Sequence, residues 1–179
     1  MNRRSIVLGC LGVKALFAQE DKKGEKLAPY YPTPELIVEK MLQLGGAKKG
    51  EKVFDLGSGD GRIVIIAAEK FGMNSVGVEF DKDLYSQSSD KIRRMGLAEK
   101  ARIIHGDLLQ QDYSSADLIT VYLLPVANDK LRPILEKQLK KGARVVAHDF
   151  EVGGWKADKM EVVEDDGEGR SHTLYLYRR

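Results

Sequence analysis

Three glycines within five positions, Gly57, Gly59 and Gly61, are the feature that most constrains the fold of this chain. They follow a short apolar stretch, residues 53–56, that has the length of a buried strand. Residues 62–71 then show the apolar spacing of a mostly buried helix. Glycine lets the backbone turn sharply and approach a ligand closely. This order predicts the ligand cradle of a dinucleotide-type fold, with helix N–H groups pointing at the ligand.

Two carboxylates, Asp55 and Asp60, flank this turn and change the kind of ligand that it suits. Backbone amides at a helix start attract a phosphate, but acids beside them repel one. A ligand with an ammonium group and hydroxyl groups fits better, and its carboxylate would face the amides. S-adenosylmethionine is such a ligand. The alternative is a tight structural turn in some other α/β fold.

Strands and helices alternate along the rest of the chain. The expected strands are residues 53–56, 75–80, 101–105, 117–122, 144–147, 160–163 and 173–177, and the expected helices are residues 34–44, 62–71, 81–95 and 128–141. The first five strands should be parallel, and the turn-rich residues 165–169 predict an antiparallel hairpin of the last two. The predicted fold class is α/β: a seven-stranded, mostly parallel Rossmann-like sheet with helices on both faces and a C-terminal antiparallel hairpin.

Polar residues follow several of the expected strands. Glu79 comes about 20 residues after the glycine turn, the spacing at which dinucleotide folds place an acid on the ribose hydroxyls. Asp107, just after the third strand, is in place to accept a hydrogen bond from an adenine amino group. Tyr122 ends the fourth strand, at the switch point where open α/β sheets bind ligands. The alternatives are a surface acid for Glu79 and a core aromatic for Tyr122.

Tyr30 and Thr33 lie in a proline-rich, extended segment before the first helix. They have two interpretations of equal weight. Both residues help to close the ligand pocket, or Thr33 caps the helix that Pro34 begins and Tyr30 is a packed aromatic residue.

The composition narrows the class of partner and of site. With 179 residues and a formal net charge of +2, the chain fits one domain and lacks a strong basic field, so nucleic acid is not an expected partner. Its one cysteine, Cys10, excludes an internal disulfide and a cysteine zinc site. We predict no metal site.

Residues 1–27 differ in composition from the predicted domain, residues 28–179. Arg3 and Arg4 precede an interrupted apolar stretch that ends at Ala18, an order similar to twin-arginine export signals. The stretch is shorter than the roughly 20 apolar residues of a membrane-spanning helix. The alternative is an extension without fixed structure. The rest of the chain predicts a cytoplasmic enzyme, whereas an export signal would imply membrane association or translocation.

Together these stretches resemble the class I S-adenosylmethionine-dependent methyltransferases. Within that class the chain is similar, over about residues 28–177, to the small protein lysine methyltransferases. These include the archaeal broad-specificity enzyme and the mitochondrial enzymes acting on the adenine nucleotide translocase and the ATP synthase c-subunit. The closer likeness rests on residues 30–34, the glycine turn, Tyr122-Leu123-Leu124-Pro125, His148-Asp149-Phe150 with Trp155, and residues 172–177.

The resemblance implies a role for each candidate site residue. Asp55, Gly57, Ser58 and Gly59 would hold the methionine part of S-adenosylmethionine, Glu79 the ribose, and Asp107 with Leu108 would border the adenine. Tyr122 would lie beside the transferred methyl group as the catalytic residue. Tyr30 and Thr33 would help to bind the cofactor by closing the pocket.

The resemblance also implies methyl transfer to lysine side chains of a protein substrate. Lysine has a pKa of about 10.4, so its amine must lose a proton, and a desolvating channel lowers that pKa. Tyr30, Tyr122 and Trp155 are candidates for aromatic walls that attract the ammonium group. No residue is required as a general base, and we expect a monomer.

Three alternative functions stay open. The first is a class I methyltransferase acting on a small molecule or RNA. The second is a nicotinamide-dependent oxidoreductase, disfavoured because the turn lacks the third glycine of the G-x-G-x-x-G pattern and because Asp60 would face a pyrophosphate. The third is a non-catalytic module that binds S-adenosylmethionine.

Overall fold

The computed structural model describes residues 30–179, which form one seven-stranded sheet with helices. The boundary predicted at residues 27 and 28 and the signal-like segment lie outside the described residues and stay predictions. The strands are β1 (Lys52–Leu56), β2 (Asn74–Glu79), β3 (Ala101–His105), β4 (Leu118–Val121), β5 (Arg144–His148), β6 (Lys159–Val163) and β7 (His172–Arg178). The helices are α1 (Glu35–Leu44), α2 (Arg62–Glu69), α3 (Lys82–Arg94) and α4 (Pro125–Gln138), with a 3₁₀ turn η1 (Leu108–Gln110).

The strand order in the sheet is β3-β2-β1-β4-β5-β7-β6. The first five strands pair in parallel, whereas β7 pairs antiparallel with both β5 and β6. The predicted fold class is therefore confirmed, including the C-terminal hairpin. After β1 the chain builds the sheet outward through β2 and β3, and it then returns to add β4 on the other side. The switch point lies between β1 and β4, where the glycine turn begins.

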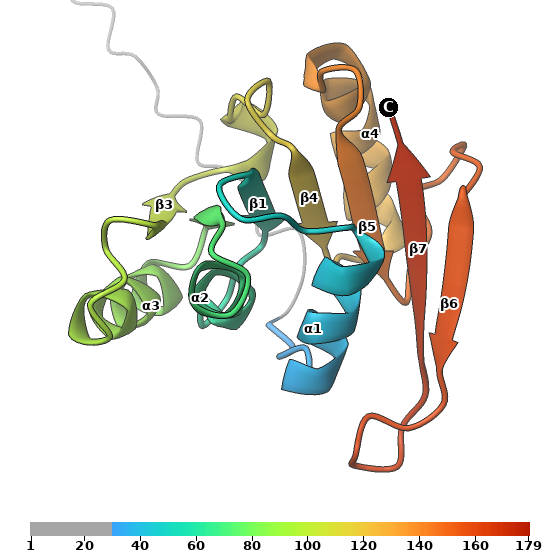
Figure 1. Cartoon of the computed structure of the whole chain (residues 1–179). Helices are drawn as coiled ribbons and strands as arrows, with labels where there is room; N and C mark the ends of the chain where they lie inside the picture. The colour runs from blue at the N-terminus through green and yellow to red at the C-terminus, as the bar shows by residue number, and fades with distance from the viewer. Residues whose placement is uncertain (1–29) are drawn as a thin grey trace, which may run out of the picture.

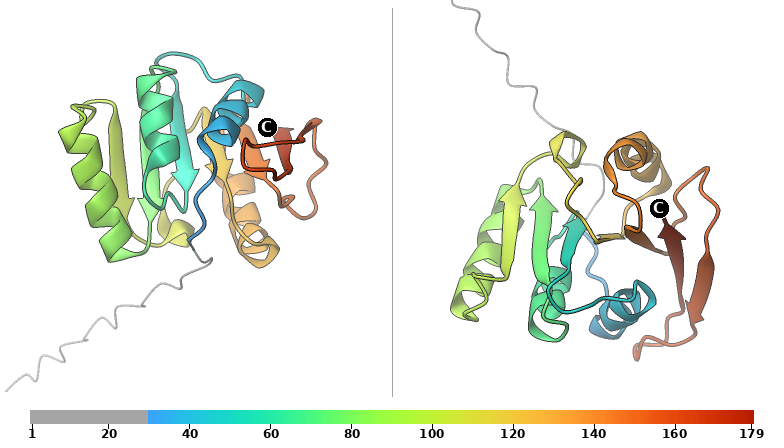
Figure 2. Two further views of the ribbon diagram at one scale, coloured as in Figure 1. Left: turned by 90° about the horizontal axis from the view of Figure 1, so that it is seen from below. Right: turned by 45° about the horizontal axis from the view of Figure 1, so that its top comes forward.

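The sheet is the middle of three layers. Figures 1 and 2 show α1, α2 and α3 together on one face and α4 on the opposite face. One apolar cluster joins α1 and α2 to the sheet through Ile37, Met41 and Ile66, and another joins α4 to the opposite face through Leu131 and Leu135. Both faces of the central strands are thus covered, which explains their nearly unbroken apolar sequences.

Two local expectations are wrong. Thr33 does not cap α1, because Pro34 is the residue before the helix and no side chain caps it; the Thr33 hydroxyl lies 3.4 Å from Nδ1 of His148 instead. Helix α4 begins at Pro125, not at residue 128. Proline suits the first turn of a helix, since its missing N–H has no helical partner there.

Among residues 30–179, no helix combines the length and the apolar character needed to cross a bilayer.

Gly77 is where the sheet comes closest to the glycine turn. This residue pairs with Asp55 on one side and with Ile103 on the other. A Cβ atom added at Gly77 would lie 2.5 Å from Oγ of Ser58 and 2.7 Å from Cδ1 of Ile103. The turn can pack this closely on β2 only because the strand has no side chain here.

We expect Gly77→Ala to lower the free energy of unfolding by about 1–3 kcal/mol, the usual effect of forcing a methyl group into a packed site. Urea unfolding of the full chain measures this effect. Gly106→Ala is the matched control, because a Cβ atom there meets only the side chain of Gln111 within 4 Å. Equal stability of the two variants would contradict the close packing at Gly77.

Candidate active site

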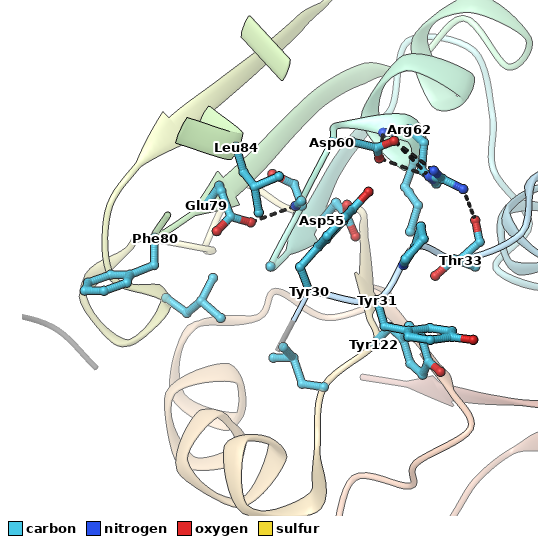
Figure 3. A pocket seen from close by; sticks show the side chains of 17 residues that line it. Tyr30, Tyr31, Thr33, Asp55, Asp60, Arg62, Glu79, Phe80, Leu84 and Tyr122 are labelled. Atoms are coloured by element: carbon cyan, nitrogen blue, oxygen red, sulfur yellow. Dashed lines mark hydrogen bonds and ion pairs between the residues drawn. The ribbon is translucent and has the colours of Figure 1, made fainter. Parts of the chain in front are cut away.

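A hollow of about 780 Å³, its open mouth included, lies at the carboxyl ends of the central strands (Figure 3). The residues after β1, β2 and β4 line it, together with the extended segment before α1. Of the ten predicted site residues, nine line this pocket: Tyr30, Thr33, Asp55, Gly57, Ser58, Gly59, Glu79, Leu108 and Tyr122. The topology therefore brings together residues from four separate parts of the chain.

Asp55 lies at the floor of the pocket, on β1, and is only 3% exposed. Its Oδ1 accepts a hydrogen bond of 2.8 Å from the hydroxyl of Thr120 on β4. Burial raises the pKa of Asp55 to about 7, against the opposing effect of the Thr120 hydrogen bond. Within residues 30–179, no lysine, arginine or histidine forms an ion pair with it. A cationic group of a ligand would favour the ionised carboxylate here.

Glu79 joins the end of β2 to the glycine turn. Its Oε2 accepts from the backbone N–H of Gly59 at 2.7 Å, and its Oε1 accepts from the backbone N–H of Asp81 at 2.8 Å. The carboxylate is buried and lines the pocket. Because each carboxylate oxygen can accept more than one hydrogen bond, both remain able to bind ligand hydroxyls.

The amides of the glycine turn have partners inside the protein, which corrects the expectation that they point at the ligand. Gly57 and Ser58 both donate from the backbone to the carbonyl of Val78. Gly59 donates to Glu79. The hydroxyl of Ser58, by contrast, is buried without a hydrogen-bond partner and belongs to the pocket lining. An unsatisfied buried polar atom in a pocket marks a place for a ligand contact.

Asp60 and Arg62 fasten the segment before α1 to the glycine turn (Figure 3). The two side chains form an ion pair of 2.8 Å, and Arg62 Nη1 donates to the carbonyl of Thr33 at 2.9 Å. Burial raises the pKa of Asp60, but the hydrogen bonds and charge of Arg62 bring it below its ordinary value. A Cβ atom on Gly59 would lie 2.6 Å from the Tyr30 ring, so this ring covers the turn. Asp60 is therefore a paired acid.

Asp107 is the one predicted site residue outside the pocket lining. Its Oδ1 accepts from the backbone N–H of Leu109 at 2.8 Å, and its Oδ2 accepts from the side chain of Gln110 at 3.3 Å. It caps the turn η1, whose first residue, Leu108, does line the pocket. Figure 3 shows Phe80 and Leu84 beside Glu79 on this side of the pocket.

Aromatic side chains form the opposite side, where the pocket opens. Tyr31 is 52% exposed, and its ring meets that of Tyr122 edge-on, with ring centres 6.4 Å apart. The Tyr122 ring packs on the buried His148 ring at 3.9 Å and stacks with Phe150 at 6.3 Å. Burial and then the nearby Asp149 carboxylate raise the pKa of Tyr122, which keeps its hydroxyl protonated. Arg170 lies against the Tyr31 ring and hydrogen-bonds to its hydroxyl.

Sequence reasoning missed several lining residues, notably Arg62, Tyr31 and Phe80. Each directly follows a residue that the motifs did identify, so adjacency was the available signal. Trp155 is a correction in the other direction. Its ring packs on Tyr177 and under the Arg179 guanidinium, and it is absent from the pocket lining. It does not form a wall of the candidate channel.

Comparisons with known proteins identify relatives over most of the chain. The model of the ANTKMT methyltransferase domain matches residues 55–159. A protein-lysine N-methyltransferase of Saccharolobus islandicus is 41% identical over 83% of this chain and 92% of its own length. The human ATP synthase c-subunit lysine N-methyltransferase is 32% identical over 83% of this chain, which spans only 60% of that longer relative.

A solved structure agrees with this relationship. It is an RNA methyltransferase from Salinibacter ruber in complex with S-adenosyl-L-homocysteine, 42% identical, with a TM-score of 0.76 over 83% of this chain and 93% of that one. The fold and the pocket at the switch point thus define a methyltransferase of class I architecture. More narrowly, the chain belongs to the family of ANTKMT methyltransferase domains. The resemblance inferred from the sequence is confirmed.

Asp55 makes the stability of the ligand-free protein depend on pH. Because its pKa in the folded protein, about 7, lies above the ordinary value, the folded state keeps this proton at a pH where the unfolded chain has lost it. The contribution is therefore destabilising, and it grows from about pH 4 to pH 7. We expect Asp55→Asn to raise the thermal midpoint at pH 8 and to change it little at pH 4.

Each kcal/mol corresponds to about 2–4 °C for a chain of this size, which calorimetry resolves. Asp117→Asn is the control, because Lys140 pairs with that carboxylate at 2.6 Å and its pKa lies below the ordinary value although burial opposes this. That substitution should not stabilise the protein at pH 8. An Asp55→Asn variant with no gain at pH 8 would show that the buried carboxyl is stabilised in the folded protein.

Proposed function

We propose that this chain transfers a methyl group from S-adenosylmethionine to the ε-amine of lysine side chains in proteins. The observation that carries the proposal is one pocket that combines two buried acids with an aromatic mouth. The name of the Saccharolobus islandicus relative, which aligns over nearly its full length, supports a lysine acceptor. The names of the mitochondrial relatives support it in the same way.

The pocket residues fit the chemical groups of this donor. Asp55 is a buried carboxyl without a cationic partner among the described residues, as the donor's ammonium group requires. The unpaired hydroxyl of Ser58 is a second polar contact. Glu79 would hold the ribose hydroxyls, as the spacing of its residue from the turn indicates. Leu108 and Phe80 would border the adenine, with Asp107 positioning the turn that carries Leu108.

When bound, the donor supplies a methyl group on a positively charged sulfur, which makes that methyl group reactive toward an amine. The residues of this chain mainly align the two reactants, and good alignment can contribute about 7–11 kcal/mol. Gly57 and Gly59 let the turn lie close to the donor, while Tyr30 and Thr33 close the pocket from the other side. Asp60 and Arg62 hold this closing segment in place.

The aromatic mouth suits a lysine side chain. Tyr31 and Tyr122 present ring surfaces that pack on an alkyl stem and attract an ammonium group. Burial behind these rings lowers the pKa of an entering amine and favours its reactive, neutral form. Tyr122 lies at the end of β4, next to the switch point, so we propose it as the residue beside the transferred methyl group.

RNA is a second candidate acceptor, because the Salinibacter ruber relative is described as an RNA methyltransferase. A net charge of +2 favours a protein over a polyanion. Location in the cytoplasm, a monomeric state, and membrane association or export through residues 1–27 stay predictions from the sequence.

The acceptor can be identified directly. Untagged protein and methyl-labelled S-adenosylmethionine are incubated with protein and with RNA from one cell lysate, and the labelled products are hydrolysed to amino acids and nucleosides. We expect label in methylated lysine. Label that survives protease and is released by nuclease would favour RNA, and label in arginine or a small metabolite would also contradict the proposal.

Glu79→Gln tests donor binding separately from the acceptor. A hydrogen bond to a charged group contributes about 1.5–3 kcal/mol, so loss of this charge should weaken binding of S-adenosylhomocysteine at least about tenfold. The glutamine keeps the size of the side chain and its hydrogen bond from Gly59, so thermal stability should change little.

Calorimetric titration measures this affinity, with Glu99→Gln as the control because Glu99 is an exposed acid beside the opposite edge of the strands. Unchanged affinity in Glu79→Gln would remove Glu79 from the donor site. Tighter binding of NAD than of S-adenosylhomocysteine by the unmodified protein would contradict the proposed donor.

A further inference from the structure

Directly behind the Tyr122 ring lies a cluster of polar side chains that the proposed function does not use. His148 and Asp149 end β5, and His172 begins β7. Asp166 comes from the loop between β6 and β7. The two histidines and Asp166 are buried, so each of their polar atoms needs a partner inside the protein.

The hydrogen bonds of the cluster have a direction. Nε2 of His172 lies 3.0 Å from Oδ2 of Asp166, and a carboxylate can only accept, so this nitrogen carries a proton. That bond holds the pKa of Asp166 well below its usual range. In a neutral His172 ring, Nδ1 is then an acceptor, and it lies 2.8 Å from Nε2 of His148. Burial lowers the pKa of His148, which favours the neutral ring that donates this proton.

Asp149 connects this buried pair to the pocket. Its Oδ2 lies 3.3 Å from Nε2 of His148 and 3.4 Å from Nδ1 of His172, while its Oδ1 accepts from the backbone N–H of Thr173 at 2.9 Å. A hydrogen bond with Asp149 also contributes to the raised pKa of Tyr122, after burial and the charge of the same carboxylate. With 27% of its side chain exposed, Asp149 is the member of the cluster that solvent reaches.

The backbone of Asp149 is strained to place this carboxylate. Its φ angle is 58°, the only positive value among the non-glycine residues that the structure describes. Left-handed conformations are uncommon for residues other than glycine, asparagine and aspartate. Such strain persists where the surrounding structure requires it, often at functional sites. Here it brings one carboxylate oxygen within reach of both imidazole rings and of Tyr122.

We propose that Tyr122, Asp149 and His172 form a relay that removes the proton from the acceptor lysine. The relay deepens the proposed function and rests on it, because it requires an amine that arrives protonated. An N–H bond of the ammonium group breaks as an O–H bond forms at the Tyr122 hydroxyl. The former hydroxyl proton passes to Oδ2 of Asp149 and then to Nδ1 of His172. The electron pair left on the lysine nitrogen is the pair that bonds to the methyl carbon.

The imidazolium formed at His172 is stabilised on both sides, by Asp166 at Nε2 and by Asp149 at Nδ1. The proton returns to solvent through the exposed edge of Asp149 after the methylated product leaves. Tyr122 and Asp149 belong to the path of the proton, whereas His148 and Asp166 are positioning residues. The charged or titratable groups that face the relay from neighbouring elements are His148, Asp166, Arg170, Tyr31 and Tyr175.

The test compares turnover of Asp149→Asn, Tyr122→Phe and the double variant over a range of pH. Asparagine tolerates the left-handed conformation and keeps the acceptor for Thr173, so the fold should survive, which circular dichroism checks. General-base catalysis typically contributes 10²–10⁴-fold, and we expect each single variant to lower kcat about 100-fold at pH 7 with unchanged donor affinity. The loss should shrink toward pH 10, where free lysine deprotonates in solution.

Non-additivity is the sharpest outcome. If both groups act on one proton, the double variant should be no slower than the slower single variant. Multiplied losses, or a loss in Asp149→Asn that does not change with pH, would overturn the relay. His105→Gln is the matched control, because His105 is an exposed histidine stacked on Tyr85, outside the pocket, and its turnover should not change.

A second measurement does not depend on methyl transfer. The chain has only three histidines, so their ring signals can be assigned by NMR with His105→Gln and His172→Gln. The signals of His148 and His172 should respond to pH together, and Asp149→Asn should shift that response without affecting His105. An unchanged response would overturn the relay even if lysine is the acceptor. A shifted response with no methyl-lysine formed would overturn the proposed function and leave the coupled proton network standing.

Discussion

The hydrogen bond between Asp55 and Thr120 crosses the point on which the rest of this structure depends. It joins β1 to β4, the two strands between which the chain changes direction. At this switch point the loops after neighbouring strands diverge and leave a hollow. The protein places a carboxyl group at its floor, away from water and without a cation of its own among the described residues. An unfavourable group at the floor of the pocket is thus compensated only when a cationic ligand binds.

The walls of the pocket come from segments that are distant in sequence and held by few polar contacts. Arg62 ties the segment before α1 to the turn after β1, and Glu79 ties that turn to β2. These contacts satisfy the amides of the turn within the protein. The donor is therefore expected to meet side chains, namely Asp55, Ser58 and Glu79, more than free backbone N–H groups. This distinguishes the site from a phosphate cradle at a helix N-terminus.

The C-terminal hairpin contributes to chemistry as well as to the sheet. Because β7 pairs with β5, His172 lies beside His148, and the loop before β7 brings Asp166 and Arg170 to the same side. The aromatic mouth and the polar cluster behind it are consequently two sides of one wall. Tyr122 separates them, with its ring on His148 and its hydroxyl near Asp149.

The sequence by itself determined the order of elements, the position of the switch point and most of the pocket, because these follow from local patterns. Apolar runs indicate strands, glycine spacing indicates the turn, and a strand end indicates the site edge for Asp55, Glu79 and Tyr122. Only the tertiary structure decided which polar groups are already paired. Asp60 pairs with Arg62, Thr33 faces His148 and Trp155 packs away from the pocket. Partners such as His148 and His172 are brought together by strand pairing, and no local pattern records a contact between residues that lie far apart in sequence.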